Sequence, residues 1–374
     1  MTFTRGWIAA IVAPIAVVAG AVAIPAIGNA ASAPPAKTAA QVLTLIAGSH
    51  DAHYSGTVQQ SSDLGLPQLP ASMSPRSQSG GFDAASLIQL VTGSHTAKVY
   101  VDGPSRQRVQ LLDTLSERDL IHDGNSLWTY DAAARTATHV TAPHGGAARG
   151  AMKGRMPHDV TPAALADQLL ASIQSTTSVT VSTGTDLGRG VYELRLAPRT
   201  TATLVGDAVV TVDAQTGVPL AVRVDARHQS TPALSVAFTS FDTTRPDASV
   251  FAFTPPQGTT VTHVRLPGTL PHHLRGQHPG DAPGNGPRHA PARRADLPTP
   301  TVIGTGWTSI VEVHGRAALT GGLGANGSAL LGELTQRVSG GRILQTSLFT
   351  VYLRDDGTVF AGAVPAATLL AAAK

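Results

Sequence analysis

The segment of residues 116–131, with the sequence SERDLIHDGNSLWTYD, places the strongest constraint on how this chain can fold. Residues 119–122 and 126–130 have the pattern of two short β-strands. Between them, Asp123-Gly124-Asn125 is a turn sequence, because Gly and Asn tolerate the positive φ that a tight hairpin requires. The segment therefore predicts a β-hairpin, with the large aromatic Trp128 at the centre of its second strand.

Further stretches with strand-like alternation precede and follow this hairpin. They cover residues 54–61, 96–101, 106–112, 136–141, 191–196, 208–213, 219–226 and 233–241. Helices are predicted at residues 38–47, at residues 82–91 and from Thr161 onward. The first helix begins with a capping box of Thr38 and Gln41, and Gly48 is placed to end it. Many antiparallel strands with few helices predict a mainly-β α+β fold, in which a sheet curls around the helices.

The N-terminus has the organisation of an export signal. Arg5 is followed by an almost uncharged apolar run, residues 7–27, and then by small residues that include Ala31-Ser32-Ala33. A charged region, an apolar region and an A-x-A sequence are typical of a cleaved signal peptide, which here would comprise residues 1–33. An uncleaved anchor is the alternative, because about 20 apolar residues can span a bilayer. Both interpretations predict that the rest of the protein is extracytoplasmic, either secreted or in the cell envelope near the membrane.

Composition divides the remaining chain into three parts. Residues 34–262 contain the strands and helices described above and are expected to form one domain. Residues 263–300 are dense in Pro, Gly, His and Arg and poor in large apolar residues, which predicts a linker. Residues 301–374 predict a small α+β domain, with strands at residues 308–313, 347–353 and 358–363 and a last helix opened by Pro365.

Several kinds of chemistry are disfavoured by the sequence. The chain has no Cys, which excludes disulfides and thiol chemistry. Its formal net charge of +3 is too small to argue for a nucleic-acid partner. The sequence has no nucleophile elbow and no acid pair in a recognisable motif, so we do not expect an enzyme.

Two motifs that are similar to ligand sites have simpler explanations. Residues 322–327, GLGANG, match a dinucleotide-binding pattern, but too few residues follow for the βαβ unit that such a site needs. His272, His273, His278 and His289 lie in the linker, where they favour a solvated segment over a preorganised metal site. We therefore predict no cofactor and no metal ion.

Two segments carry a resemblance to a known family. They are residues 120–131, LIHDGNSLWTYD, and residues 247–261, DASVFAFTPPQGTTV. Both are similar to segments of the LolA-like group of envelope proteins, which includes the LolA and LppX lipoprotein carriers and the MucB/RseB-type regulators. The resemblance covers residues 38–262 and implies a half-open, curved antiparallel β-barrel with helices in its mouth. Gly103 stands where the carriers have an Arg that helps to hold their lid, so the resemblance does not extend to that gate.

The resemblance implies an apolar space between sheet and helices that accommodates acyl chains. Alternation shows which residues of a strand share a face, but it does not say which face is inside. The candidate cavity residues are Leu111, Leu127 or Trp128, Tyr192, Leu194, Val222, Phe238 and Phe251. The leading hypothesis is a non-enzymatic protein that binds an acyl chain, a lipid or a lipidated protein. The alternative is an RseB-like regulator that binds a membrane-bound anti-sigma factor, which the second domain and the linker favour.

Overall fold

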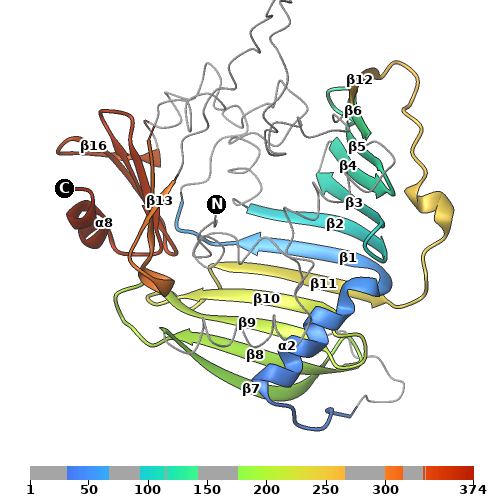
Figure 1. The fold of residues 1–374 in the computed structure, drawn as a ribbon, viewed down its shortest axis with the longest axis horizontal. Helices are drawn as coiled ribbons and strands as arrows, with labels where there is room; N and C mark the ends of the chain where they lie inside the picture. The colour runs from blue at the N-terminus through green and yellow to red at the C-terminus, as the bar shows by residue number, and fades with distance from the viewer. Residues whose placement is uncertain are drawn as a thin grey trace, which may run out of the picture.

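The computed structural model describes residues 32–66, 93–113, 116–141, 176–265, 300–314, 332 and 334–374 of the 374-residue chain. These residues form one sheet of twelve strands and one of six strands, with short helices beside them. The larger sheet curves without closing into a barrel, and the smaller sheet lies at one end of it (Figure 1). The predicted fold class, a mainly-β curved sheet with a small C-terminal α+β unit, is confirmed.

The larger sheet contains the strands β1 to β12. Their bounds are His53–Ser62 (β1), Gly93–Asp102 (β2), Arg106–Asp113 (β3), Ser116–Asp123 (β4), Ser126–Asp131 (β5), Thr136–Thr141 (β6), Thr177–Asp186 (β7), Arg189–Pro198 (β8), Val205–Asp213 (β9), Pro219–Ala226 (β10), Leu234–Asp242 (β11) and Thr260–Arg265 (β12). The order of neighbours is β12-β6-β5-β4-β3-β2-β1-β11-β10-β9-β8-β7. Neighbours pair antiparallel except β12 and β6, which are parallel. The chain therefore starts in the middle of the sheet, builds one half through β6, and returns to the middle from the other edge.

Tight turns join neighbouring strands where the backbone adopts positive φ. Gly124, with φ of +60°, lies between β4 and β5, as predicted from the turn sequence. Leu187 and Gly188, with φ of 49° and 72°, join β7 to β8 in a two-residue turn of type I′. Strand β7 is not among the strands predicted from the sequence, because its Ser- and Thr-rich segment has few apolar residues to mark the alternation.

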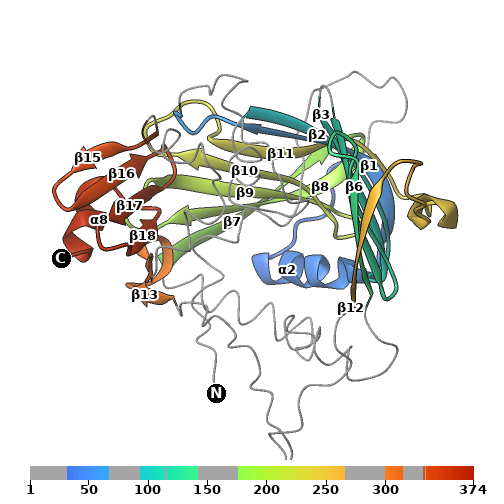
Figure 2. The same ribbon diagram turned by 90° about the horizontal axis from the view of Figure 1, so that it is seen from above.

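The pairing register assigns each side chain of the large sheet to one of its two faces. Residues opposite each other on paired strands share a face, and so do residues two apart on one strand. One face carries the helix α2 (Ala39–Gly48), and we call it the inner face. It lies inside the angle between the half that contains β2–β6 and the half that contains β7–β11 (Figure 2). The opposite side is called the outer face.

Helix α2 begins where the sequence predicts. The Gln41 backbone N–H donates to Thr38 Oγ1 at 3.3 Å, and the Thr38 N–H donates to Gln41 Oε1 at 2.9 Å. This is the predicted capping box, which satisfies two of the amide groups that a helix N-terminus leaves free. The helix ends at Gly48, but with φ of −76°, and a 3-10 turn, Ser49–Asp51, follows. The left-handed conformation that Gly often supplies after a helix is therefore not used here.

A segment between β11 and β12, residues 243–259, crosses the outer face of the β2–β6 half, and we call it the strap (Figure 2). Its 3-10 turn, Ala248–Phe251 (η3), begins at Asp247, whose Oδ1 accepts from the Ser249 N–H at 2.8 Å. Arg108 of β3 holds the strap by donating from Nη1 to the Val250 carbonyl oxygen at 3.0 Å. The strap leads into β12, which continues to Arg265. Residues 263–265, assigned to the linker from composition, thus belong to the sheet.

The smaller sheet has the order β13-β14-β18-β17-β16-β15. Its strands are Thr301–Ile303 (β13), Ile310–Val313 (β14), Gln336–Val338 (β15), Gly341–Gln345 (β16), Thr350–Arg354 (β17) and Val359–Gly362 (β18). The helix α8 (Ala366–Ala372) starts directly after Pro365, as predicted. Leu369 of α8 is fully buried and packs with Tyr352 and Phe360 of this sheet. The unit therefore has an apolar core of its own.

The two sheets contact each other through hydrogen bonds and apolar side chains. The hydrogen bonds run from Trp307 Nε1 to Thr177 Oγ1 (2.7 Å), from the Leu204 N–H to the Ala363 carbonyl (2.9 Å) and from the Ser347 N–H to the Leu64 carbonyl (3.0 Å). Trp307 and Leu348 pack around Val205, Val222 and Val224 of the larger sheet. The smaller sheet is therefore docked on one end of the larger sheet (Figure 1).

Some sequence predictions lie outside the described residues. They concern residues 1–31 of the export signal, the helices at residues 82–91 and from Thr161, residues 266–299 of the linker and the Gly-rich residues 322–327.

Candidate functional site

Five half-buried apolar side chains form a continuous surface on the inner face of β3–β6, which we call the inner patch. They are Val109, Leu111, Leu120, Leu127 and Val140. Val109 pairs with Leu120, and Leu127 pairs with Val140, so the members of each pair lie side by side. On β2, Ala97 pairs with Leu111 and Val99 pairs with Val109, which extends apolar surface toward the middle of the sheet. The inner patch is thus apolar surface that the described helices leave partly accessible.

Continuous strand pairing connects the inner patch to residues that lie beneath α2. Leu111 pairs with Ala97, Ala97 with Val58, and Val58 with Phe238. Val236 lies two residues before Phe238 and therefore on the same face. A second series of paired residues starts there: Val236 pairs with Val222, Val222 with Val210, and Val210 with Leu194. Tyr192 lies two residues before Leu194 and packs against Val42 of α2. Five predicted cavity residues therefore share the inner face, namely Leu111, Tyr192, Leu194, Val222 and Phe238.

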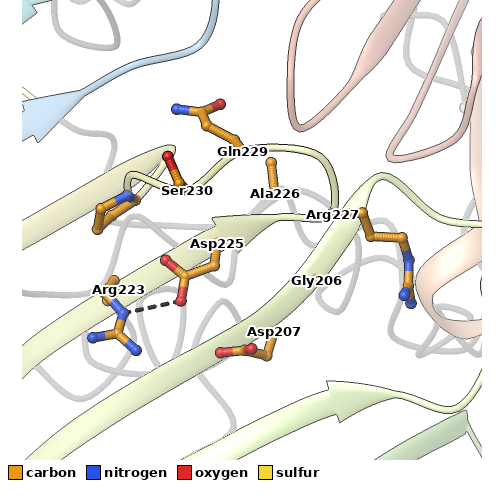
Figure 3. A pocket seen from close by; sticks show the side chains of 9 residues that line it. Gly206, Asp207, Arg223, Asp225, Ala226, Arg227, Gln229 and Ser230 are labelled. Atoms are coloured by element: carbon orange, nitrogen blue, oxygen red, sulfur yellow. Dashed lines mark hydrogen bonds and ion pairs between the residues drawn. The ribbon is translucent and has the colours of Figure 1, made fainter.

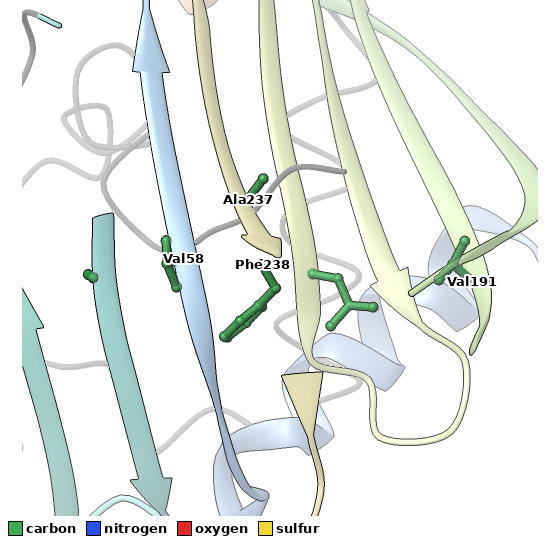
Figure 4. Packing of buried hydrophobic residues seen from close by; sticks show 6 residues of the cluster. Val58, Val191, Ala237 and Phe238 are labelled. Carbon is green, nitrogen blue, oxygen red and sulfur yellow. The ribbon is translucent and has the colours of Figure 1, made fainter. Parts of the chain in front are cut away.

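Four of these five residues are closed core rather than accessible lining. The exposed fractions are 0% for Phe238, 1% for Tyr192, 2% for Leu194 and 7% for Val222. Phe238 packs against Val58 of the neighbouring strand (Figure 4). The Tyr192 hydroxyl donates to the Pro35 carbonyl oxygen at 2.9 Å, while α2 covers its ring. Leu111 alone among the five is half-buried, so it is the predicted residue that belongs to the inner patch.

The other two predicted residues, Trp128 and Phe251, are placed on the outer face. The Trp128 ring stacks on His139 of β6, with centroids 4.0 Å apart, and meets Phe253 of the strap at 5.3 Å. Phe251 of the strap is 2% exposed and lies under the Arg106 guanidinium, which is 5.8 Å from the ring centroid. Both residues belong to the core between sheet and strap. On β5, Leu127 rather than Trp128 faces the inner side.

Three residues of the inner patch, Val109, Leu120 and Val140, are not among the site residues predicted from the sequence. Each of them lies in a strand that alternation predicted. Alternation shows which residues share a face, but it does not show which face is the inner one. For Leu120, the pairing of the two strands of the predicted hairpin is a signal in the sequence. This pairing brings Leu120 and Leu127 near each other on one face.

Two polar side chains next to the inner patch, Arg118 and His122, each have a polar partner. Arg118, opposite Leu111, forms an ion pair with Asp131 in which Nε and Oδ2 are 3.3 Å apart. His122 Nε2 is 3.0 Å from the Gly124 carbonyl oxygen. Within the described residues, no group of three or more His, Asp or Glu side chains is placed to hold a metal ion. The arrangement thus offers apolar contact area, bordered by an ion pair.

A hollow elsewhere on the large sheet differs from the inner patch in its chemistry. It is a hollow of about 420 Å³ at the ends of β9 and β10 (Figure 3). Arg223 Nε and Asp225 Oδ2 lie 3.0 Å apart at its wall, and Arg195 Nη2 lies 2.6 Å from Asp207 Oδ2. Arg227 donates from Nη2 to the Thr200 carbonyl oxygen at 2.6 Å and from Nε to the Thr203 carbonyl oxygen at 2.9 Å. Because its charges compensate one another, this hollow is a poor match for an apolar ligand.

Comparison with known proteins finds similarity at the level of solved structures. No protein-family model matches the chain, and no curated protein matches it. A complex of MucA and MucB from Pseudomonas aeruginosa matches with a TM-score of 0.43 and 14% identity, over 89% of this chain and 96% of that chain. A LolA superfamily protein from Nitrosomonas europaea matches with a TM-score of 0.25 and 9% identity, over 58% of this chain and 99% of that chain.

The structures similar to this chain thus include both branches of the LolA-like group that the sequence motifs resemble. In the part of the chain that the structure describes, no helix is both long and apolar enough to cross a membrane.

Proposed function

We propose that this protein is a non-enzymatic binder of an acyl chain, either of a free lipid or of a lipidated protein, and that the inner patch is its binding surface. The supporting observation is the continuity of Val109, Leu111, Leu120, Leu127 and Val140 on one face of four neighbouring strands. Neighbouring strands lie about 4.8 Å apart, so the surface from β2 to β6 extends for roughly 19 Å across the sheet. An acyl chain that lies across the strands would contact the patch along much of its length.

The physical basis of such binding is the transfer of apolar surface out of water. Each buried methylene contributes about 0.8 kcal/mol, so affinity comes from the length of the chain rather than from a few polar contacts. Specificity for a head group would require polar groups at the end of the patch. The ion pair of Arg118 with Asp131 is the charged feature that borders it.

The experiment is a titration of the full chain with a fluorescent fatty-acid probe, in the wild type and in two matched variants. Leu111→Asp places a charge on the inner patch. Leu112→Asp places the same charge at the next residue, which is 37% exposed and points to the outer face. We expect saturable binding that weakens about tenfold or more in Leu111→Asp, since a charge that faces an acyl chain loses its water, and that stays unchanged in Leu112→Asp.

Phe238 and Leu194 are unsuitable for this test, because a charge in a closed core would unfold the sheet. The proposal is refuted if the wild type binds no probe, or if both variants bind it equally well while circular dichroism shows that both are folded.

The second candidate function is that of an RseB-like regulator, which binds the extracytoplasmic part of an anti-sigma factor. We propose it because a second sheet is docked on the first through Trp307, Ser347 and Ala363, which gives the protein a composite surface that acyl-chain binding alone does not require. Titration with a purified anti-sigma-factor segment, followed by calorimetry, separates the two candidates. Binding of the segment without any binding of the fatty-acid probe would favour the regulator.

Both candidates require an extracytoplasmic protein, and we propose that residues 1–33 direct its export. A fusion of residues 1–40 to a reporter that is active only outside the cytoplasm should be active, and an inactive but expressed reporter would contradict the proposal. We further propose that two domains are connected by a linker. The sequence predicts this linker at residues 263–300, and because β12 extends the first domain to Arg265, we propose that it comprises residues 266–300. Limited proteolysis should cut this connection first.

A further inference from the structure

Strand β7 is the long edge of the large sheet. It has ten residues, TSVTVSTGTD, that pair with β8 over their whole length without a bulge. The other edges formed by described strands are shorter, with six residues in β12 and three each in β13 and β15. Proteins protect exposed edges by shortness, by Pro, by Lys, by bulges or by a covering segment. The sequence of β7 has none of the first four features, and in the described part of the chain no strand pairs with its outer side. Its one charged residue, Asp186, stands at its end.

The hairpin geometry shows which backbone groups of β7 point away from the sheet. In a two-residue hairpin the closing pair, here Asp186 and Arg189, is hydrogen bonded, and bonded pairs then recur at every second residue. The Arg199 N–H donates to the Thr176 carbonyl oxygen at 2.9 Å, which continues the same even-numbered series. The N–H and C=O groups of the odd-numbered residues therefore point outward. These residues are Val179, Val181, Thr183 and Thr185, and a fifth, Thr177, has its carbonyl oxygen taken by Arg199 Nε at 3.2 Å.

The side chains beside this edge define what a strand added to it would need. The odd-numbered residues lie on the inner face, where Val181 pairs with Leu194 and packs with the α2 cluster of Val42. An added strand would place the side chain opposite Val181 on the same face, against an apolar layer. Apart from Gly184, the even-numbered residues are polar, and they lie on the outer face, where Ser182 Oγ donates to Glu193 Oε2 at 3.1 Å. The added strand would therefore alternate apolar and polar residues.

We propose that β7 is a docking edge for an extended segment of a partner protein, which adds to the sheet as a thirteenth, antiparallel strand with apolar residues at alternate positions. Such strand addition takes its affinity from main-chain hydrogen bonds and its specificity from the alternate side chains. The edge is at the opposite end of the sheet order from β3–β6, so the proposal is independent of the acyl-chain function of the inner patch.

The test uses a short fluorescent peptide of alternating valine and threonine with a lysine at each end, titrated into the full chain and followed by anisotropy. A peptide of the same sequence with N-methyl groups at alternate residues is the control, because it cannot complete the ladder. We expect saturable binding of the first peptide alone. On its addition, hydrogen exchange should slow at the amides of Val179, Val181, Thr183 and Thr185, because they become hydrogen bonded.

A pair of variants isolates the backbone contribution. Thr183→Pro removes an outward N–H that β8 does not use, and Thr183→Ser retains it. Thr183→Pro should weaken peptide binding about tenfold or more, while Thr183→Ser binds as the wild type does. Unchanged binding by folded Thr183→Pro overturns the proposal, and so does the absence of peptide binding. A third outcome would also overturn the proposal. If the free protein has the mass of two copies in solution and its four amides already exchange hydrogen slowly, a second copy of the chain occupies β7.

Discussion

Phe253 of the strap packs against Trp128 of β5, with ring centroids 5.3 Å apart and ring planes inclined by 58°. Phe253 also contacts the Tyr130 ring at 5.4 Å. The Phe residues of the motif at residues 247–261 therefore fasten the strap to the outer face, and the aromatic side chain at the hairpin centre belongs to that contact. This motif has a structural explanation that is separate from ligand binding.

Phe253→Ala should lower stability without affecting the inner patch. Removing a fully buried Phe side chain costs about 3–5 kcal/mol, and because Phe253 is half-buried we expect about 2 kcal/mol. The measurement is urea unfolding of both proteins, together with a fatty-acid titration. Phe253→Leu is the control, and its free energy of unfolding should fall by less than that of Phe253→Ala, since Leu keeps most of the apolar contact. A loss of probe binding in folded Phe253→Ala would contradict the assignment of the strap to the opposite face.

Asp213 should contribute stability that disappears in acid. It is 0% exposed, and its two carboxylate oxygens accept from Arg189 Nε at 2.7 Å and Nη2 at 3.0 Å. Burial acts to raise the pKa of Asp213, but the hydrogen bonds from Arg189 and Thr216 outweigh it and hold the pKa below its usual value. The pair's contribution is therefore complete above the pKa of the unfolded carboxyl, about 3.9, and is lost as pH falls through the lower folded pKa.

Asp213→Asn is the variant that tests this contribution. At pH 7 it should unfold with a free energy lower by about 3 kcal/mol, the lower end for breaking a buried pair, because the Arg189 side chain is partly exposed. The difference from the wild type should shrink as the pH is lowered below about 3.9. Arg223→Ala is the control, since its ion pair with Asp225 is solvent-exposed and contributes little. A difference that is the same at every pH would contradict the assignment.

His139 should make the folded protein less stable when the medium is mildly acidified. Burial, followed by repulsion from His263 on β12, lowers the pKa of His139. The unfolded chain therefore binds a proton more readily than the folded one, so the free energy of unfolding falls as pH drops below about 6.5. Chemical unfolding at pH 7.5 and at lower pH measures this effect. In His139→Gln the free energy of unfolding should fall less between the two pH values than it does in the wild type. An equal fall in both proteins would contradict the role assigned to His139.

Gly306→Ala should weaken the contact between the two sheets. Gly306 has φ of +60°, and a Cβ built on it would lie 2.7 Å from Oγ1 of Thr176, the residue before β7 of the larger sheet. Gly304→Ala is the matched control, because its φ of +81° carries a similar conformational cost while its Cβ would meet no atom closer than 3.4 Å. In both variants the left-handed conformation should lower the free energy of unfolding by about 1–2 kcal/mol. In Gly306→Ala the contact with Thr176 should lower it further. Equal thermal unfolding of the two variants would argue against a tight junction.

Much of the local structure could be predicted from the sequence, because it depends on neighbouring residues. The capping box of Thr38 with Gln41, the turn at Gly124 and the start of α8 after Pro365 are each formed within a few residues of chain. Alternation predicted ten of the twelve strands of the large sheet for the same reason, whereas β7 and β12, with few apolar residues, lack that signal.

Only the tertiary structure decided which face of the sheet is the inner one. The two-residue period of a strand is the same for both of its faces, so the sequence pattern does not show whether Leu127 or Trp128 faces inward. The faces differ only because α2 packs on one side of the sheet and the strap on the other. The parallel pairing of β12 with β6 likewise joins residues more than a hundred positions apart, and no local pattern specifies it. The sequence by itself determined that this chain forms hairpins with one apolar side. Long-range packing determined which of those sides is closed by the strap and which remains partly open as a surface for a ligand.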